Sequence, residues 1–592
     1  MKTQTTSYYN VPRFDCFRDL LAYSVEKAGD KAALQLKVSA GKYRYISYKE
    51  LYEIYMSLCA SFIRHGLEGK RIAVSGENSG GWAIAYLAAA TVGVVVPIDK
   101  ELSGRDIADF CDAADCTAIC ADKKVQGKLE GVRRFDCVYD LSEIPDRPIK
   151  YTPRDLQRIN SYTYPPDQMR ILIFTSGTTG SSKGVCLSQF NVCSNVHQIL
   201  RVIRVYTTDK VLSILPLHHT YAATIDMLCV LARGACISYC DGLNRIATNL
   251  KEYNNTVLVV VPALLKVLSK RLRMAIAKEC PQKYKKAFDE LSLAEALGTL
   301  PFFVRKVICS NVKKSLGGKL RMMVVGAAAI DPALIEDFNA LGIKTIQGYG
   351  LTETSPILSA NNDFFYDPET AGCAIPGVTL RIANPDENGV GEIIASGDNV
   401  MLGYYRDEEA TAAVIKNRWF HTGDLGFIDS NGGVHIKGRI KNVIVTANGK
   451  NIFPEEIEDR LGENEAIAEC LVLEGKDRHG DPCVRAKIYP SEAYLAEKLG
   501  HTPAPEEIKA AVTDAVNAVN DAVPAYKQPL LLLSLHALML AKSENDRHRI
   551  RTWFNRAEME RLRYYERKLR DLVKTDSALG FEILNDPRGT IS

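Results

Sequence analysis

A run of small hydroxyl residues and glycines follows an apolar segment at residues 171–184, Ile-Leu-Ile-Phe-Thr-Ser-Gly-Thr-Thr-Gly-Ser-Ser-Lys-Gly. Glycines let the backbone turn sharply and approach a ligand closely, while the Ser and Thr hydroxyls donate hydrogen bonds and Lys183 adds a positive charge. Such groups together can bind a polyphosphate. The Gly-Lys-Ser/Thr order of a Walker A loop is absent, so we predict a phosphate-binding loop of another kind. The candidate phosphate ligands are Thr175, Ser176, Gly177, Thr178, Thr179, Gly180 and Lys183.

Four other segments concentrate polar, charged or aromatic residues, and three of the four also contain glycine. They are Leu-Pro-Leu-His-His-Thr-Tyr at 215–221, Gln-Gly-Tyr-Gly-Leu-Thr-Glu-Thr at 347–354, Trp-Phe-His-Thr-Gly-Asp-Leu at 419–425 and Gly-Arg-Ile-Lys-Asn at 438–442. With the loop at 171–184 they resemble the motifs of AMP-forming adenylating enzymes, which include acyl- and aryl-CoA synthetases, luciferases and the adenylation domains of peptide synthetases. The motifs stand in the family's order, and the resemblance covers roughly residues 15–550.

The resemblance implies a role for each of these residues. Glu353 and Thr175 would bind Mg²⁺, a hard cation that prefers oxygen ligands, and Thr352 would contact the α-phosphate of ATP. Tyr349 would stack on adenine, and Asp424 would accept hydrogen bonds from the ribose hydroxyls. Other implied roles are those of Arg439 at the ribose or phosphate and of His219 beside the substrate carboxylate. The nucleotide site would be completed by Gly326, Ala327, Gln347, Gly348 and Gly350.

The implied reaction has two steps. A carboxylate attacks the α-phosphate of ATP to give acyl-AMP and pyrophosphate, and the thiol of CoA then displaces AMP. Family members rotate a small C-terminal domain between the steps, here about Lys441, and Gly449 would then face the acyl-adenylate. Residues 304–331 and the segment between Arg271 and Phe302 look most like long-chain fatty acyl-CoA synthetases, so a fatty acid is the predicted substrate, with ATP, Mg²⁺ and CoA as cofactors.

One catalytic position departs from the family pattern. The family lysine that bridges the carboxylate and the phosphate is replaced by Arg547 when the segment is aligned on Lys542. An arginine keeps the charge but has a planar, forked geometry, so the change is not conservative. Two alternatives therefore stay open: an acyl-AMP ligase that loads an acyl carrier protein, and a degenerate nucleotide-binding regulatory homologue.

The elements that must position these residues alternate between short apolar runs and helical patterns. Strands are expected at Arg71–Val74, Val94–Pro97, Ile171–Phe174, Val211–Leu215, Val257–Val261, Met322–Val325 and Lys344–Gln347, and helices at Tyr48–Arg64 and Leu264–Ala277. This alternation predicts an α/β fold with layered, mostly parallel sheets. From about Val378 shorter strands and Gly-rich turns predict a small β subdomain. We predict an N-terminal domain at 1–437, a hinge at 438–442, a mobile α+β C-terminal domain at 443–550 and an extension at 551–592.

Composition is that of an ordinary globular protein. Hydrophobic residues make up 46% and charged residues 24% of the 592 residues, and the formal net charge of +3 predicts no nucleic-acid partner. The 16 cysteines are dispersed, which favours reduced thiols over a disulfide scaffold. The polar start predicts no secretory signal, and the apolar run Trp82–Ile98 is shorter than a membrane span and predicts a buried helix followed by a strand.

The expected location is therefore the cytoplasm. The extension contains a basic amphipathic segment at residues 551–574, with eight Lys and Arg against four Asp and Glu. Such a helix packs on its own domain or lies on a partner or a membrane surface, so peripheral membrane contact, if present, is expected there.

Overall fold

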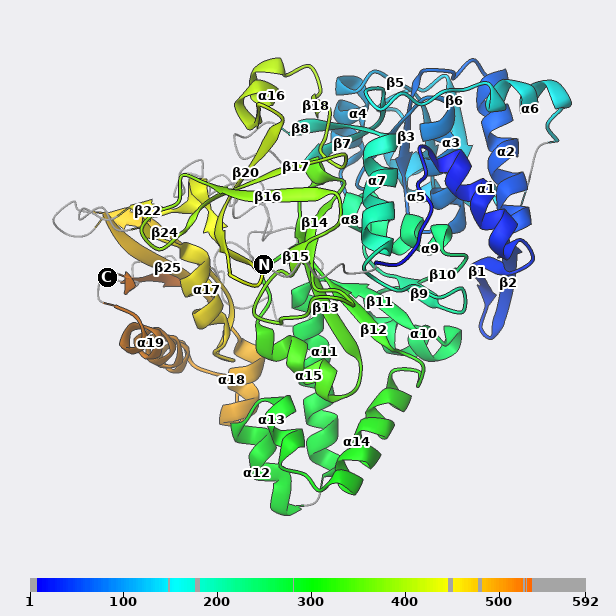
Figure 1. The fold of residues 1–592 in the computed structure, drawn as a ribbon. Coiled ribbons are helices and arrows are strands. Elements are labelled where there is room, and N and C mark those ends of the chain that lie inside the picture. The colour runs from blue at the N-terminus through cyan, green and yellow to red at the C-terminus, as the bar shows by residue number, and fades with distance from the viewer. Residues whose placement is uncertain are drawn as a thin grey trace. The chain divides into compact units, whose positions relative to one another are not determined.

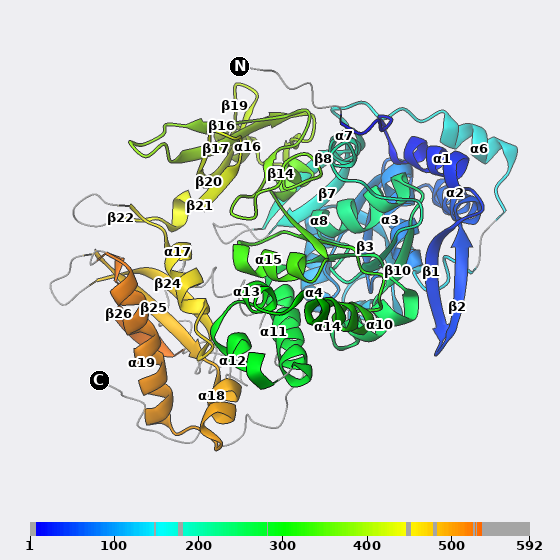
Figure 2. The ribbon, with the colours of Figure 1, turned by 60° about the horizontal axis from the view of Figure 1, so that its bottom comes forward.

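The computed structural model describes residues 8–146, 150–175, 182–280, 282–445, 451–476, 482–524, 527–528 and 530–534. Its contacts separate two compact units. The first unit comprises the described parts of residues 1–175, 183–422 and 427–435, and the second comprises residue 182, residues 423–426 and the described residues from 436 onward. Figures 1 and 2 show the elements of both.

A nine-stranded sheet forms one half of the first unit. Its inner strands are parallel, and antiparallel strands close both edges. In sheet order the strands are β15 (Cys373–Ala374), β14 (Ile357–Ala360), β13 (Lys344–Gly350), β12 (Met322–Val325), β11 (Val257–Val260), β9 (Lys210–Ser213), β10 (Cys236–Tyr239), β1 (Ala32–Ser39) and β2 (Lys42–Ser47).

A seven-stranded sheet forms the other half. Five of its strands pair in parallel, whereas β8 is antiparallel to both of its neighbours. In sheet order the strands are β18 (Gly403–Tyr404), β8 (Lys183–Ser188), β7 (Met169–Thr175), β4 (Val94–Pro97), β3 (Arg71–Ser75), β5 (Cys116–Ala121) and β6 (Cys137–Asp140).

Helices cover both faces of each sheet because successive strand residues point to opposite sides. In β11, Val257 and Val259 belong to the large central core, whereas Leu258 and Val260 belong to a second core under the outer helices. The central helices are α1 (Phe17–Ala28), α2 (Tyr48–Arg64), α3 (Gly80–Val92), α7 (Gln189–Leu200), α8 (Thr220–Ala222), the π-helix η1 (Ala223–Leu228) and α9 (Cys229–Ala232). A third core lies between the seven-stranded sheet and two helices, α4 (Gly104–Ala113) and α5 (Lys123–Leu129).

The outer helices of the nine-stranded sheet form the second core, with α12 to α14 low in Figure 1. They are α10 (Ile246–Tyr253), α11 (Pro262–Glu279), α12 (Gln282–Glu290), α13 (Leu293–Gly298), α14 (Phe302–Ser315) and α15 (Pro332–Ala340). Smaller elements of the first unit are α6 (Pro153–Asn160), the 3-10 turns η2 (Leu243–Arg245) and η3 (Thr352–Thr354), and α16 (Glu408–Val414).

The prediction of shorter strands after residue 378 is wrong, because the strand Trp419–Ile428 has ten residues whereas β9 and β12 have four each. A five-stranded sheet contains β16 (Val378–Ala383), β17 (Gly391–Gly397), β19 (Ile415–Lys416), β20 (Trp419–Ile428) and β21 (Val434–Arg439). The elements after β21 belong to the second unit. They are η4 (Ile440–Asn442), β22 (Ile444–Val445), β23 (Asn451–Ile452), α17 (Pro454–Gly462), β24 (Ile467–Lys476), β25 (Pro482–Pro490), α18 (Glu492–Leu499), α19 (Pro505–Ala522) and β26 (Leu530–Ser534).

The expected α/β fold class is confirmed, and several elements have the predicted bounds, such as Tyr48–Arg64 and Met322–Val325. The strand predicted at Val211–Leu215 ends earlier, at Ser213. Its end is set by Asn78, whose side-chain amide donates to Ser213 Oγ at 3.1 Å and to the Leu215 carbonyl at 2.7 Å.

The described part of the chain contains no helix that is both long and apolar enough to cross a bilayer. The run Trp82–Ile98 forms the buried helix α3 and the strand β4, as expected. The described cysteines are all unbridged.

Candidate functional site

The predicted phosphate loop connects two strands of the seven-stranded sheet. β7 ends at Thr175 and β8 begins at Lys183, and these two residues are opposite each other in the antiparallel ladder. The Thr175 hydroxyl donates to the Lys183 carbonyl at 3.4 Å. The loop residues Ser176, Gly177, Thr178, Thr179 and Gly180 lie outside the described residues. The hairpin therefore places the hydroxyl at one end of the loop beside the lysine at the other.

Tyr404 connects this hairpin to Glu353. It lies on β18, which pairs with β8, so that Tyr404 is opposite Val185. The Lys183 ammonium nitrogen is 4.8 Å from the centroid of the Tyr404 ring, a distance typical of a cation–π contact. The Tyr404 hydroxyl donates to Glu353 Oε1 at 2.9 Å. Two predicted site residues, Lys183 and Glu353, thus contact one tyrosine that the sequence analysis missed.

Glu353 lies in the 3-10 turn η3, directly after β13. The backbone of this turn is fixed on both sides: the Met401 N–H donates to the Glu353 carbonyl at 2.8 Å, and the Asn399 amide donates to the Thr354 carbonyl at 2.8 Å. At Gly350 a Cβ would lie 1.8 Å from the Pro356 carbonyl oxygen, so no other residue fits there. The turn consequently presents Thr352 and Glu353 from a rigid backbone.

The remaining predicted residues of β13 are held largely by the protein itself. Tyr349 is buried and pairs with Ser359, and Gly348 pairs with Ala360 across the antiparallel edge. The Gln347 side-chain amide donates to the carbonyls of Pro368, at 3.1 Å, and Thr370. These bonds commit the nitrogen of Gln347 to the neighbouring loop, so only its carbonyl oxygen is left for a nucleotide.

His219 lies in the loop between β9 and α8, where it precedes the first residue of the helix. Asn78 fixes this loop, because its carbonyl oxygen accepts from the Leu217 N–H at 3.0 Å. The ring of His219 is exposed and lies 4.1 Å, centroid to centroid, from the ring of His218. His218 Nε2 is in turn 4.0 Å from a carboxylate oxygen of Asp99. Asn78 and Asp99 could not be predicted as neighbours of this histidine loop, because only the fold brings these distant residues together.

Gly326 and Ala327 follow the carboxyl end of β12, where open α/β sheets bind ligands. A Cβ at Gly326 would lie 2.9 Å from Cζ of Tyr221, so glycine is required for this ring to pack there. Ala327 has a left-handed backbone with φ of 69°. Burial raises the pKa of Tyr221 well above its usual value. The neutral, half-buried ring of Tyr221 therefore packs beside the predicted nucleotide residue Gly326.

Two further predicted residues lie together in the second unit. Asp424 on β20 and Arg439 on β21 form an ion pair, with 3.0 Å between Arg439 Nε and Asp424 Oδ1. The Asp424 side chain is 6% exposed and that of Arg439 is 47% exposed, so the guanidinium extends toward solvent from a buried carboxylate. Lys441 lies two residues later, in the 3-10 turn η4. Gly449 and Arg547 lie outside the described residues.

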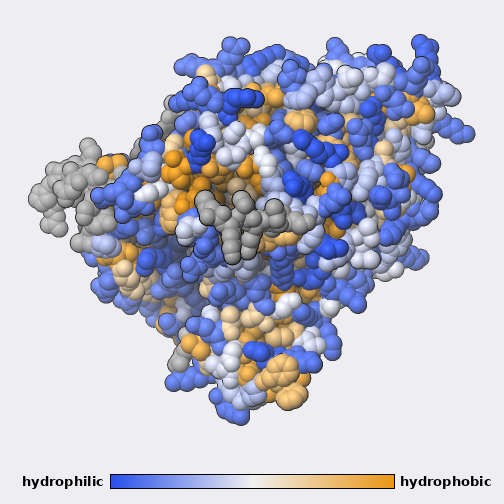
Figure 3. Space-filling model, viewed as in Figure 1, coloured by the Kyte–Doolittle hydropathy of each residue, from blue (hydrophilic) through white to orange (hydrophobic). Residues whose placement is uncertain are grey.

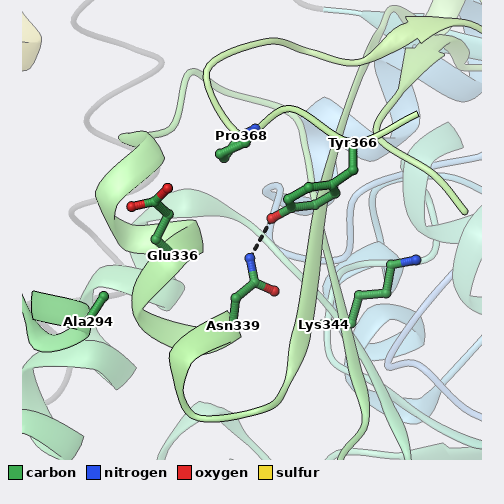
Figure 4. Close-up of a pocket in the computed structure, with 6 residues that line it drawn as sticks. All are labelled: Ala294, Glu336, Asn339, Lys344, Tyr366 and Pro368. Atoms are coloured by element: carbon green, nitrogen blue, oxygen red, sulfur yellow. Dashed lines mark hydrogen bonds between the residues drawn. The ribbon is translucent and has the colours of Figure 1, made fainter. Parts of the chain in front are cut away.

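An open pocket of about 550 Å³ lies between α15 and the loop that precedes Pro368 (Figure 4). Its polar lining comes from Glu336, Asn339, Lys344 and Tyr366, and the Asn339 amide donates to the Tyr366 hydroxyl. None of the predicted site residues lines this pocket. It is a surface feature separate from the cluster around Glu353.

The model of the AMP-binding enzyme family matches residues 21–405. This chain belongs to the AMP-binding enzyme family. The match confirms the resemblance inferred from the motifs. Thr175, Lys183, Glu353 and Tyr404 lie inside the matched range, so the first-unit cluster is part of the AMP-binding fold itself.

Curated relatives include the long-chain-fatty-acid–CoA ligase ACSBG2 of Xenopus laevis, 29% identical over 77% of this chain and 67% of that protein. An indoleacetate–CoA ligase of Aromatoleum aromaticum is 28% identical over 77% of this chain and 86% of its own length. Among solved structures, ATP-bound MatB of Rhodopseudomonas palustris is similar with a TM-score of 0.67 and 23% identity, covering 87% of this chain and 94% of MatB. The AMP-binding fold thus extends over most of this chain.

Proposed function

We propose that this AMP-binding enzyme activates a fatty acid with ATP and transfers the acyl group to CoA. A carboxylate oxygen of the acid attacks the α-phosphorus, and the bond to pyrophosphate breaks. The thiol sulfur of CoA then attacks the acyl carbon, and the bond to AMP breaks. The observation that carries the proposal is the cluster of Thr175, Lys183 and Glu353, which flanks the hydroxyl-rich loop in a chain of this family.

The residues present fit a Mg²⁺ ion bound with the nucleotide. Mg²⁺ is usually bound by one or two carboxylates together with substrate phosphates and waters, and prefers oxygen ligands. Glu353 supplies a carboxylate, and among the described residues its Oε1 accepts a hydrogen bond from Tyr404. Thr175 supplies a hydroxyl at the edge of the loop. Such an ion would offset the negative charge of the phosphates. Lys183 adds a cation that is oriented by the Tyr404 ring.

A fatty acid is the proposed substrate because several curated relatives are long-chain-fatty-acid–CoA ligases. An aromatic acid is the alternative that the indoleacetate–CoA ligase suggests. The half-buried, neutral ring of Tyr221 beside Gly326 offers an apolar surface that suits an acyl group.

The test is AMP release with acids of increasing chain length and with indoleacetate, measured with CoA, with a phosphopantetheinyl carrier protein and without acceptor. We expect CoA-dependent AMP release with fatty acids. If only the carrier protein accepted the acyl group, the protein would be an acyl-AMP ligase that loads a carrier and not a CoA ligase. Normal ATP binding without ATP–pyrophosphate exchange for any acid would contradict the enzyme proposal.

We also propose that η4 is the hinge between the two half-reactions. A proline at position 441 fixes φ and removes a backbone N–H, so Lys441→Pro should slow thioester formation by roughly tenfold or more while leaving ATP–pyrophosphate exchange largely intact. Lys441→Ala is the matched control, because it removes the side chain but keeps the backbone flexible. Equal rates of both half-reactions in Lys441→Pro and the parent protein would exclude a hinge at this position.

A further inference from the structure

Helices α11 to α14 carry an unusual concentration of positive charge. Residues 262–315 contain twelve of the chain's 74 Lys and Arg but four of its 71 Asp and Glu, so the rest of the chain is net acidic. α14 alone carries four cations and no acidic residue. Arg305 and Lys306 form no ion pair with any described residue. The charges of Arg305 and Lys306 therefore face solvent, and no described residue neutralises them.

The same helices expose large apolar side chains. Phe303 is 79% exposed, more than any other large apolar residue in the described part of the chain, and Phe302 and Val307 are 61% and 59% exposed. Val267 and Met274 of the neighbouring helix α11 are also exposed. Figure 3 shows apolar surface among polar residues over these helices at the bottom of the view. Exposed apolar patches of this kind mark surfaces that bind a partner or a membrane.

The apolar and cationic side chains share one face of α14. Ile308 and Val312 point into the second core and fix the helix. On the exposed side Lys306 lies one turn after Phe302, and Val307 lies one turn after Phe303, so an ammonium group and apolar side chains are neighbours on the helix surface. A rigid helix with aromatic residues and lysines on its outer face fits the interface of a bilayer, where rings enter the headgroup region and cations meet lipid phosphates.

We propose that the exposed face of α11 and α14 docks on an anionic lipid bilayer. Arg305 and Lys306, which form no ion pair with any described residue, favour an anionic surface, and the exposed phenylalanines supply the apolar contact. The residues of this surface are different from those of the basic segment at 551–574. The inference does not rest on the proposed catalytic function, because it concerns charge and exposure alone.

Co-sedimentation with vesicles tests the proposal on the full chain. We expect binding to phosphatidylcholine vesicles that contain phosphatidylglycerol, weak binding to phosphatidylcholine alone, and loss of binding as salt increases. Each cation near an anionic surface contributes roughly fivefold to partitioning, so Arg305→Gln with Lys306→Gln should weaken binding by about tenfold or more. Phe302→Ser with Phe303→Ser should weaken it to a similar extent.

Two control pairs remove equivalent groups elsewhere. Lys42→Gln with Arg105→Gln removes two exposed cations, and Val38→Ser with Val138→Ser removes two exposed apolar side chains. Both pairs should bind like the parent protein. Failure of the parent protein to bind anionic vesicles, or equal binding by the α14 variants, would overturn the proposal. The proposal would also be overturned if the parent protein self-associated without lipid and Phe302→Ser with Phe303→Ser abolished that association. A second copy of the chain would then cover this face.

A site-specific probe separates this face from the C-terminal extension. Phe303→Trp places a fluorophore at the most exposed ring. On binding, its emission, taken as the difference from the parent protein, should shift to the blue and be quenched by brominated lipid. An unchanged difference spectrum in a protein that is bound to vesicles would show that another part of the chain makes the contact.

Discussion

Replacing Glu353 with glutamine should lower ATP–pyrophosphate exchange by roughly 10²–10³-fold, the range seen when one preorganised electrostatic group is removed from a reaction centre. Glutamine has the shape of glutamate and can still accept the hydrogen bond from Tyr404, which is 2.9 Å long. The variant therefore removes the negative charge and keeps the turn η3 intact. If Glu353 binds Mg²⁺, the Mg²⁺ concentration for half-maximal exchange should also rise.

Two further variants test whether the effect is specific to the Glu353 carboxylate and to its orientation. Glu369→Gln removes an exposed carboxylate from a loop of the same unit and should leave exchange unchanged. Tyr404→Phe removes only the hydrogen bond that orients Glu353, and it should reduce exchange by about tenfold, as outer-shell changes at metal sites do. A Glu353→Gln enzyme with the parent rate and the parent Mg²⁺ dependence would remove Glu353 from the metal site.

The parts of the site that could be predicted are those whose chemistry is local in sequence. The loop at 171–184 is recognisable because a buried strand, glycines, hydroxyls and a lysine are consecutive. The turn at Thr352–Thr354 is similarly compact. Buried strands were predictable as well, because short apolar runs such as Met322–Val325 are buried on both faces.

The parts that could not be predicted depend on contacts between distant segments. Tyr404 is 51 residues from Glu353 and acquires its role because β18 pairs with β8. Asn78 is 137 residues from Leu215, whose loop it fixes. The exposed side of α14 is also invisible in sequence, because Phe302 and Phe303 look like core residues until the packing of Ile308 and Val312 shows which face is inside.

Asp226→Asn should stabilise the protein at neutral pH, although most substitutions in a core destabilise. Asp226 lies in the π-helix η1 and is fully buried. Neither of its carboxylate oxygens has a hydrogen-bond partner among the described residues. Burial raises the pKa of this carboxyl well above its usual range, because no neighbour replaces the water that the charged form loses.

The sign of the pH dependence follows from the proton count. In the unfolded chain Asp226 ionises near its ordinary pKa, while in the folded chain it keeps its proton to higher pH. The unfolding free energy therefore falls by about 1.4 kcal/mol per pH unit between these two pKa values, and the penalty is absent at lower pH. Asparagine has a similar shape and does not titrate. The variant should therefore be more stable than the parent protein at pH 7 and should show no gain near pH 4.

Urea unfolding of both proteins over a pH series measures this difference, and Asp209→Asn provides the opposite case. Burial alone would raise the pKa of Asp209, but its bonds to Arg321, to the Tyr206 N–H and to Thr256 outweigh burial and lower it. That carboxylate stabilises the fold above its unfolded pKa and loses the effect as the pH falls through the folded value. Asp209→Asn should therefore destabilise at pH 7 by about 2–4 kcal/mol, less so in acid. If Asp226→Asn instead destabilised the protein at pH 7 and less so in acid, as expected for Asp209→Asn, the Asp226 carboxylate would have to be a charged, partnered group, and its burial would not be the cause of its behaviour.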